Sequence, residues 1–237
     1  MMNITMIGHS TVLIELGGKK ILTDPYFGTW GNPAYKRLSP AAKGRQELTE
    51  VDFVLLSHNH WDHTDPRYFR LLSTDVPVLL PARGAFVAKL KGVKNMIKLR
   101  AWENRQFDEI RVTAVPATHI ATTIGYVIEC PDVVIYFAGD TFYRPFMKDI
   151  GTRFKIDLAL LPVTTYRIPM TMSEKSAVKA VEDLNPKIVI PIHLALQPRS
   201  PLLRTKQTAT GFRDRLAAEK IEVKTVILSE GETWTYG

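Results

Sequence analysis

The order of apolar and polar residues along the chain predicts strands and helices in alternation. Two short apolar runs, Thr11 to Leu16 and Lys20 to Asp24, are separated by Gly17-Gly18, and this spacing predicts a β-hairpin. An apolar strand is also expected at Ile110 to Pro116. Nearly continuous apolar runs, as expected of strands covered on both faces, lie at Val51 to Ser57, Val133 to Phe137, Asp157 to Val163 and Lys187 to Ile192. Helices must supply this covering.

The clearest helix is predicted over Glu174 to Leu184, because its apolar residues recur on one face and Pro186 follows its end. Thr171 and Glu174 resemble a capping box at its start. Further helices are expected at Pro66 to Leu72 and between Thr205 and Lys220. The strands of the first half, and those from about Ile110 onward, suggest two layers of sheet with helices outside. This is an α/β architecture in which functional sites gather at strand ends.

Length and composition predict one domain over residues 1–237, since the chain has 237 residues of which 45% are apolar. The amino terminus has no basic stretch followed by an apolar run, and no window approaches a membrane span. Cys130 is the single cysteine, which excludes an intramolecular disulfide and fits a reducing compartment. We therefore expect a cytoplasmic protein without a transmembrane segment.

The chain is basic, with 31 Lys and Arg against 24 Asp and Glu and a net charge of +7. Such a balance permits an anionic substrate, a nucleic acid or simply a well solvated surface. The charge alone favours the solvated surface until a basic cleft is found.

The densest group of ionisable residues is Ser57-His58-Asn59-His60-Trp61-Asp62-His63, directly after an apolar strand. A loop at a strand's carboxyl end can aim imidazoles in two directions. Neutral imidazole and carboxylate are metal ligands, and their clustering on a rigid strand end lowers the cost of ordering them. Packing alone gives no reason for adjacent ionisable groups at this place, so the motif predicts a metal site.

Other candidate ligands also follow predicted strands. His119 follows Ile110 to Pro116, Asp140 follows Val133 to Phe137, and His193 follows Lys187 to Ile192. If these strand ends converge, the ligands are too many for one tetrahedral zinc and suit two metals that share a carboxylate. We expect two divalent ions, with Zn2+ first and Mn2+ or Fe2+ as alternatives.

The order of these residues resembles the metallo-β-lactamase superfamily over nearly the whole chain. Leu22-Thr23-Asp24-Pro25 looks like its early aspartate motif, and His58-x-His60-x-Asp62-His63 looks like its metal-binding motif. The resemblance implies a first ion bound by His58, His60 and His119 and a second bound by Asp62, His63 and His193, with Asp140 as the bridge. It also implies a four-layered αββα sandwich with the metals at one edge of the sheets.

Three segments resemble the branch that contains ascorbate-6-phosphate lactonase and the N-acylphosphatidylethanolamine-hydrolysing phospholipase D: Gly8 to Ser10, Phe137 to Thr141 and Pro186 to His193. Two details separate the chain from other branches. The di-iron electron-transfer members resemble His-x-Glu-x-Asp, whereas this chain has His60 at the position of the glutamate. This difference favours hydrolysis. Cys130 lies too early for the metal-binding cysteine of many antibiotic-hydrolysing members, and we interpret it as a structural thiol.

Two metals can hold a bridging hydroxide and polarise an electrophile, so no serine or cysteine nucleophile is required. Asp62 is the expected catalytic residue, because it would bind the second metal and orient the hydroxide. His9 is a candidate substrate contact or hydrogen-bond partner of a ligand, or else a buried histidine bonded to backbone. Asp24 either caps a turn or bonds to a metal ligand.

Candidate substrate contacts outside the ligand set are Tyr166 and Arg167, which follow the strand Asp157 to Val163. Arg167 could bind a phosphate or carboxylate, although an exposed arginine is more often only solvated. The segment from Pro25 to Glu47 holds Tyr26, Phe27, Trp30 and Tyr35, and it forms either a substrate wall or a loop packed on the core.

The sequence favours a small-molecule hydrolase that acts on an anionic ester, phosphodiester or lactone, and a phosphorylated substrate is expected. A nucleic-acid phosphodiesterase is the alternative, disfavoured because no added nucleic-acid module is evident. A non-enzymatic metal-binding protein is less favoured, because the full ligand set is present. The substrate, the native metal and the oligomeric state stay open.

Overall fold

The computed structural model describes residues 1–29 and 31–236, and it contains two seven-stranded sheets. The first has the order β16-β1-β2-β3-β5-β6-β7. Its strands are β1 (Met2–Gly8), β2 (Thr11–Leu16), β3 (Lys19–Thr23), β5 (Phe53–Leu55), β6 (Val78–Pro81), β7 (Met96–Leu99) and β16 (Thr233–Tyr236). From β3 to β7 the neighbouring strands are parallel, so their carboxyl ends share one edge of the sheet.

The second sheet has the order β15-β13-β12-β11-β10-β9-β8. Its strands are β8 (Asn104–Phe107), β9 (Ile110–Pro116), β10 (Ile124–Cys130), β11 (Val133–Phe137), β12 (Leu158–Pro162), β13 (Ile188–Ile192) and β15 (Lys224–Thr225). The strands from β11 to β15 are parallel. A separate pair, β4 (Tyr35–Arg37) and β14 (Leu196–Pro198), joins two segments that are far apart in sequence.

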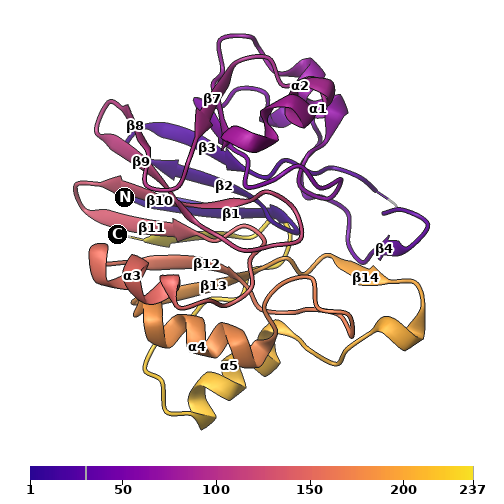
Figure 1. Cartoon of the computed structure of the whole chain (residues 1–237), viewed down its shortest axis with the longest axis vertical. Coiled ribbons are helices and arrows are strands. Elements are labelled where there is room, and N and C mark those ends of the chain that lie inside the picture. Colours follow the sequence, from indigo (N-terminus) through magenta and orange to yellow (C-terminus); the bar gives the residue numbers. More distant parts are fainter. Residues whose placement is uncertain (30, 237) are drawn as a thin grey trace.

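Helices cover the outer face of each sheet, which gives the expected αββα sandwich (Figure 1). The first sheet packs on α1 (Pro66–Leu71) and α2 (Ala85–Leu90), and the second on α3 (Phe146–Arg153), α4 (Glu174–Leu184) and α5 (Ala209–Ala218). Short 3-10 turns lie at Gln46–Leu48, Ala82–Gly84 and Pro201–Leu203. The largest apolar cluster lies between the sheets, where inward-facing strand residues are removed from water.

Several sequence predictions are confirmed. The hairpin of β2 and β3 turns at Gly17 and Gly18, whose φ angles of +55° and +73° suit glycine. The helix over Glu174–Leu184 has the predicted bounds, but its cap differs: Ser173 and Ser176 form the capping box, while Thr171 Oγ1 donates to the carbonyl of Thr141.

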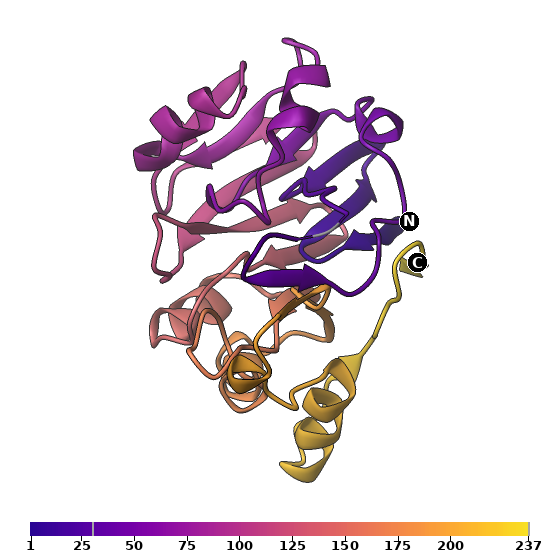
Figure 2. The ribbon, with the colours of Figure 1, turned by 90° about the vertical axis from the view of Figure 1, so that its right-hand side faces the viewer.

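We expected the strands of the first half of the chain in one sheet and those from about Ile110 onward in the other. The structure corrects this expectation at two strands. The strand β8 precedes Ile110 yet belongs to the second sheet, and the carboxyl-terminal β16 returns to pair with β1 in the first. Because of this pairing the two ends of the chain lie side by side (Figure 1, Figure 2). The helices α2 and α3 were not predicted.

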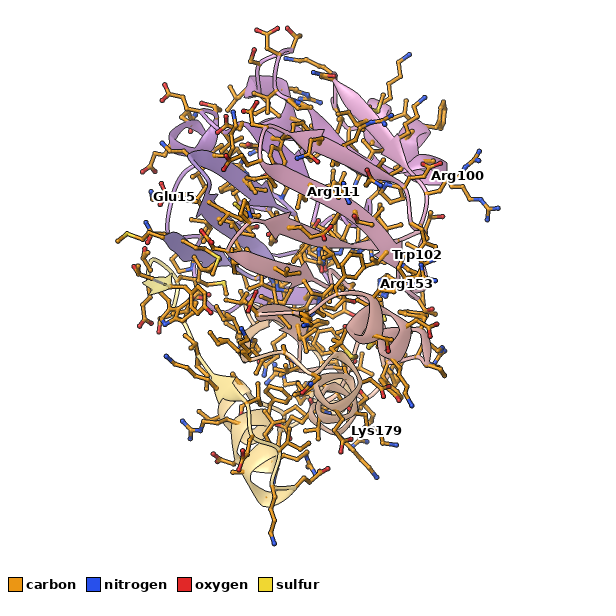
Figure 3. All side chains as sticks on the ribbon, turned by 90° about the vertical axis from the view of Figure 1, so that its left-hand side faces the viewer. Glu15, Arg100, Trp102, Arg111, Arg153 and Lys179 are labelled. Carbon is orange, nitrogen blue, oxygen red and sulfur yellow. The ribbon has the colours of Figure 1, made fainter. Side chains whose placement is uncertain are left out.

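The outer surface carries acidic and basic side chains in mixture, as Figure 3 shows for Glu15, Arg100, Arg111 and Lys179. The Arg153 guanidinium lies 4.2 Å from the centre of the Trp102 ring, which ties α3 to the turn before β8. Within residues 1–29 and 31–236, the structure has no helix long and apolar enough to cross a membrane.

Candidate metal centre

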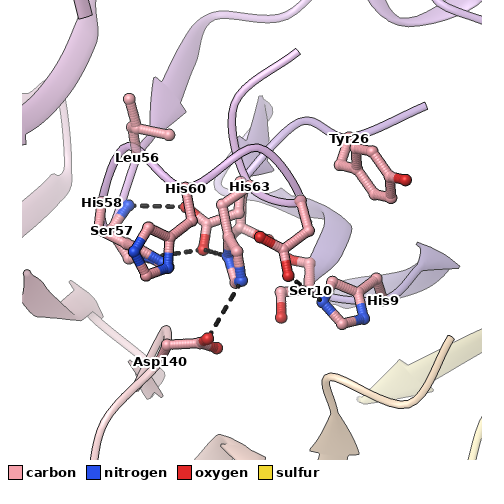
Figure 4. A network of polar contacts seen from close by, with 12 residues as sticks. His9, Ser10, Tyr26, Leu56, Ser57, His58, His60, His63 and Asp140 are labelled. Carbon is pink, nitrogen blue, oxygen red and sulfur yellow. Dashed lines mark hydrogen bonds and ion pairs between the residues drawn. The ribbon is translucent and has the colours of Figure 1, made fainter. Parts of the chain in front are cut away.

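The candidate ligands meet at the edge where the two sheets present their strand ends. Figure 4 shows four of them, His58, His60, His63 and Asp140. The first sheet supplies the loop after β5 and the turn between β1 and β2. The second sheet supplies residues that follow β9, β11 and β13. The structure thereby brings together every metal ligand predicted from the sequence: His58, His60, Asp62, His63, His119, Asp140 and His193.

One group of possible ligand atoms belongs to His58, His60 and His119, and these atoms all lie within 4.8 Å of one another. His119 Nε2 is 3.1 Å from His60 Nδ1, and the rings meet edge to face. These are the three histidines that the resemblance assigns to the first ion, and their atoms lie close enough together to hold one.

A second group belongs to His9, Asp62, His63 and His193, with the same 4.8 Å limit between ligand atoms. It contains all three ligands predicted for the second ion. It also includes His9, which is a candidate substrate contact or hydrogen-bond partner of a ligand.

Asp140 lies between the two groups. Its Oδ2 atom is 3.2 Å from His193 Nε2, 3.4 Å from His63 Nε2 and 3.9 Å from His119 Nε2. Its Oδ1 atom is buried and has no hydrogen-bond partner among the described residues. A carboxylate at this place can reach toward both groups.

Asp24 orients two of the histidines through a buried hydrogen-bond network. Its Oδ2 accepts hydrogen bonds from His63 Nδ1 at 2.7 Å and Ser57 Oγ at 2.6 Å, and its Oδ1 accepts one from Ser57 N at 2.7 Å. Both oxygens are therefore engaged, which suits a partner of a ligand better than a ligand. The contact with His63 is a hydrogen bond between Asp24 and one of the candidate ligands, as the second alternative for Asp24 predicts.

Ser57 extends the network to His58, and sequence reasoning assigned it no role. Its Oγ–H is donated to Asp24, so Ser57 Oγ accepts a hydrogen bond from His58 Nδ1 at 2.9 Å. This fixes the tautomer in which His58 Nε2 carries the lone pair. The only signal in the sequence was the position of Ser57, next to the first histidine of the motif.

The electrostatics favour the protonation states that metal ligands need. Burial lowers the pKa of His58 well below its usual value and lowers the pKa of His119 to about 4, so both rings are neutral at pH 7. Burial opposes ionisation of Asp140, but His193 and His63 hold the pKa of that carboxyl well below its usual value. Neutral imidazole and ionised carboxylate are the forms that bind divalent cations.

His63 differs from its neighbours, because it lies between two carboxylates. Burial lowers its pKa, but Asp140 and Asp24 together raise it well above its usual value. A metal ion would take the place of the proton on Nε2, while the Nδ1 proton stays donated to Asp24.

Buried polar atoms of the candidate ligands that lack a hydrogen-bond partner among the described residues include His58 Nε2, His63 Nε2 and Asp140 Oδ1. Buried polar groups are normally paired, so these atoms indicate a ligand. Imidazole and carboxylate donors fit divalent ions such as zinc, manganese or iron.

A pocket of about 170 Å³ opens directly beside the ligands. Its walls are formed by Tyr35, His60, Trp61, Asp62, Ile120, Asp140, Tyr166, Met170 and His193. Of the candidate substrate contacts, Tyr166 lines this pocket. Arg167 is exposed and is absent from the lining, and His9 is also absent from the lining, with its side chain fully buried.

The aromatic segment from Pro25 to Glu47 packs partly on the core and partly reaches the pocket. Tyr26 and Phe27 are buried against the core, at 4% and 3% exposure. Tyr35 lies in the pocket wall. Trp30 falls outside the described residues.

Comparison with known proteins identifies the family to which the chain belongs. Residues 3–193 match the family described as the Beta-lactamase superfamily domain. A UPF0173 metal-dependent hydrolase of Caldivirga maquilingensis is 34% identical over 95% of this chain and 94% of its own length. One from Methanopyrus kandleri is 30% identical over 98% of this chain and 99% of its own. The chain belongs to the metallo-β-lactamase superfamily and is a metal-dependent hydrolase.

Solved structures support the fold. An isothiocyanate hydrolase from Delia radicum gut bacteria has a TM-score of 0.83 at 21% identity, with 99% of each chain covered. The metallo hydrolase Igni18 from Ignicoccus hospitalis has a TM-score of 0.79 at 22% identity, covering 100% of this chain and 99% of its own. At this identity the likeness concerns the fold alone.

Proposed function

We propose that the chain is a two-metal hydrolase of a small ester, lactone or phosphodiester. His58, His60 and His119 would hold one ion, Asp62, His63 and His193 the other, and Asp140 would bridge them. The observation that carries the proposal is the position of Asp140 Oδ2, 3.9 Å from His119 Nε2 in one group and 3.2 Å from His193 Nε2 in the other. Likeness to the lactonase and phospholipase D branch is part of this proposal and rests on the sequence motifs.

When bound, two divalent ions supply an attacking hydroxide at neutral pH and polarise the scissile group. The role of Asp62 follows from its place in both the ligand group and the pocket wall. Burial opposes its ionisation, but the nearby His9 and His63 lower the pKa of Asp62 below its usual value. An ionised Asp62 can accept a hydrogen bond from the attacking water and direct it toward the substrate.

The dimensions of the pocket support a small molecule over a nucleic acid. Its volume is about 170 Å³, and no lysine or arginine is among the described residues that line it. A nucleic acid needs several phosphate contacts along a basic track. With Arg167 exposed and outside the lining, the expected preference for an anion rests on the metal ions alone.

The test joins metal analysis to turnover. The wild-type protein should bind two ions per chain, and Asp140→Ala should lose hydrolysis and weaken the binding of at least one ion. Asp214→Ala, an exposed aspartate on α5, is the matched control and should behave as wild type.

Substrates should span lactones, carboxylic esters, phosphodiesters and single-stranded RNA. No more than one ion per chain, or near-normal turnover by Asp140→Ala at full occupancy, would refute the two-metal assignment. Much faster turnover of RNA that falls steeply with salt would favour the nuclease. Full occupancy without turnover of any of these compounds would refute the proposed substrate classes.

A further inference from the structure

The pocket beside the candidate metal ligands is also lined by five uncharged aromatic and apolar side chains, here called the wall. They are Tyr35, Trp61, Ile120, Tyr166 and Met170. Burial raises the pKa of Tyr166 above its usual value, so its hydroxyl is uncharged. Apart from the metal ligands themselves, the described lining therefore offers no charged side chain to a substrate.

Contacts among the aromatic residues hold this wall in place. The Tyr35 and Tyr166 rings have centroids 5.2 Å apart, and the Trp61 ring lies 6.3 Å from Tyr35. Tyr166 also donates from its hydroxyl to the carbonyl of Leu196 at 3.3 Å, and Leu196 belongs to β14, the partner of the strand that carries Tyr35. The wall is thus preformed, and a ligand group that fits it loses little affinity to ordering.

We infer that the substrate carries an uncharged alkyl or aryl group next to the bond that is cleaved, and that this group lies against Tyr35, Trp61 and Tyr166. The inference rests on the proposed function and names its substrate class. A charged group here would lose its hydration without gaining a partner. The volume of about 170 Å³ is close to that of a cavity known to hold benzene, roughly 150 Å³.

Binding of hydroxamates to the metal-loaded protein tests this wall without requiring turnover. Acetohydroxamate, phenylacetohydroxamate and the monohydroxamate of succinic acid share one metal-binding head and differ in the attached group. We expect the phenyl compound to bind at least about 10-fold more tightly than acetohydroxamate, and the carboxylate compound to gain nothing. Tyr35→Ala and Trp61→Ala should each remove most of the phenyl advantage, and Arg167→Ala should keep it.

Tighter binding of the carboxylate compound than of the phenyl compound would overturn the inference. So would a phenyl advantage that survives in both wall variants. Hydrolysis is measured separately on matched phenyl- and carboxylate-substituted lactones and phosphodiesters. No turnover of any compound, with the order of hydroxamate affinities retained, would refute the proposed function and leave the wall assignment standing.

A second inference rests on His9. Its side chain is fully buried, and its Nε2 atom lies 3.5 Å from Asp62 Oδ2. The ring nitrogens have no hydrogen-bond partner of normal geometry among the described residues. Its ring centroid is 4.1 Å from that of His193.

The backbone holds His9 in this place. His9 and His193 have φ angles of +61° and +65°, a left-handed conformation that residues other than glycine rarely adopt. The amide of His193 donates to the carbonyl of His9 at 2.9 Å, so the turn after β1 is joined to the end of β13. Such conformations persist where the surrounding structure fixes them, and they cluster at functional sites.

We propose that His9 is a further ligand of the second ion, beside Asp62, His63 and His193, whose ligand atoms lie within 4.8 Å of one another. With Asp140 the second ion would then have more protein ligands than the four of a structural zinc. The first group has three histidines, so the two ions would differ in affinity and coordination number.

Cobalt(II) loading tests the assignment, because its visible spectrum reports coordination number. His9→Ala should change the spectrum of the second ion and weaken its binding at least about 10-fold in competition with a chromophoric chelator. Added imidazole should restore part of that affinity. His9→Gln, which can still donate a hydrogen bond to Asp62 but binds cobalt poorly, should resemble His9→Ala.

Ser10→Ala is the control for damage to the turn, and circular dichroism checks folding of each variant. If His9→Ala does not fold, the spectrum of His9→Gln decides. An unchanged spectrum and affinity in either folded variant would overturn the proposal. Full restoration by His9→Gln would make His9 a positioning residue for Asp62.

Discussion

Replacing Asp24 by asparagine changes one atom of the network behind the ligands. Asparagine keeps an acceptor oxygen for the amide of Ser57, which lies 2.7 Å from Oδ1. The NH2 group of asparagine would replace Oδ2, which accepts hydrogen bonds from Ser57 Oγ at 2.6 Å and from His63 Nδ1 at 2.7 Å. Two hydrogen-bond donors would then face each other. To avoid this, His63 must move its proton from Nδ1 to Nε2, the atom that faces Asp140.

The expected result is a selective loss at the ion that His63 binds. Loss of a hydrogen-bond partner of a metal ligand typically weakens metal affinity by about 10- to 100-fold. Each factor of ten corresponds to about 1.4 kcal/mol. Chelator competition with zinc or manganese should show one weakened ion, and the ion bound by the group containing His119 should change less.

Asp52→Asn is the control, because Asp52 is an exposed aspartate that accepts a hydrogen bond from the amide of Lys20. Circular dichroism establishes that Asp24→Asn is folded. Unchanged affinity for both ions in folded Asp24→Asn would refute the reasoning, since it would show that Asp24 does not set the tautomer of His63. Equal weakening of both ions would point to a general disturbance of the loop.

Three further results are expected. Tyr126→Phe should lower the free energy of unfolding by about 1–3 kcal/mol in urea, because the buried Tyr126 hydroxyl lies 2.9 Å from the carbonyls of both Leu56 and Leu79. Gly139→Ala should cost at least about 1–2 kcal/mol and weaken metal binding, because Gly139 has a φ of +56° and an added Cβ would lie 2.3 Å from Ser57 Cβ. With chelator present, acid should destabilise the fold: burial lowers the pKa of His119 to about 4 from 6.5, so the unfolded chain binds the proton first and stability falls as pH drops from 6.5 towards 4. Urea titrations should show a flatter pH dependence in His119→Gln, and an equal slope would contradict this account.

The convergence of the candidate ligands was predictable because metal chemistry restricts residue type and fold restricts position. His58 follows β5, Asp140 follows β11 and His193 follows β13, and each of these strands is recognisable from its apolar run. In each sheet the parallel strands end at the same edge, so residues that follow them meet. The division of the ligands between two ions stays a prediction, as does the cytoplasmic location.

The pocket wall was not predictable in the same way. Tyr35 lies on the three-residue strand β4, whose partner β14 is far away in sequence, and three residues are too few to show a period. Tyr166 and Arg167 were both candidate substrate contacts because they follow the strand Asp157 to Val163. In an irregular loop adjacent side chains diverge, and here Tyr166 faces the pocket while Arg167 faces solvent.

The helix α2 and the position of the strand β16 could not be predicted either, because their sequences carry no local signal. The helix α2 has only six residues, and Phe86 and Leu90 on it are 73% and 71% exposed, so its apolar residues do not share one buried face. The strand β16 lies in the first sheet because it pairs with β1. Nothing local distinguishes it from a strand that extends the second sheet.

The centre depends on contact between the two sheets, and this ties metal binding to folding. His9 and the loop with His58 come from the first sheet, whereas Asp140 and His193 come from the second. The amide of His193 donates to the carbonyl of His9, and the amide of Ile124 donates to the carbonyl of Ser57, so main-chain bonds join the sheets beside the ligands. An ion with ligands from both sheets binds to the protein when the sheets are packed together and not when they are separated. By linkage its binding free energy adds to the stability of that packing, in proportion to the logarithm of its concentration over its dissociation constant.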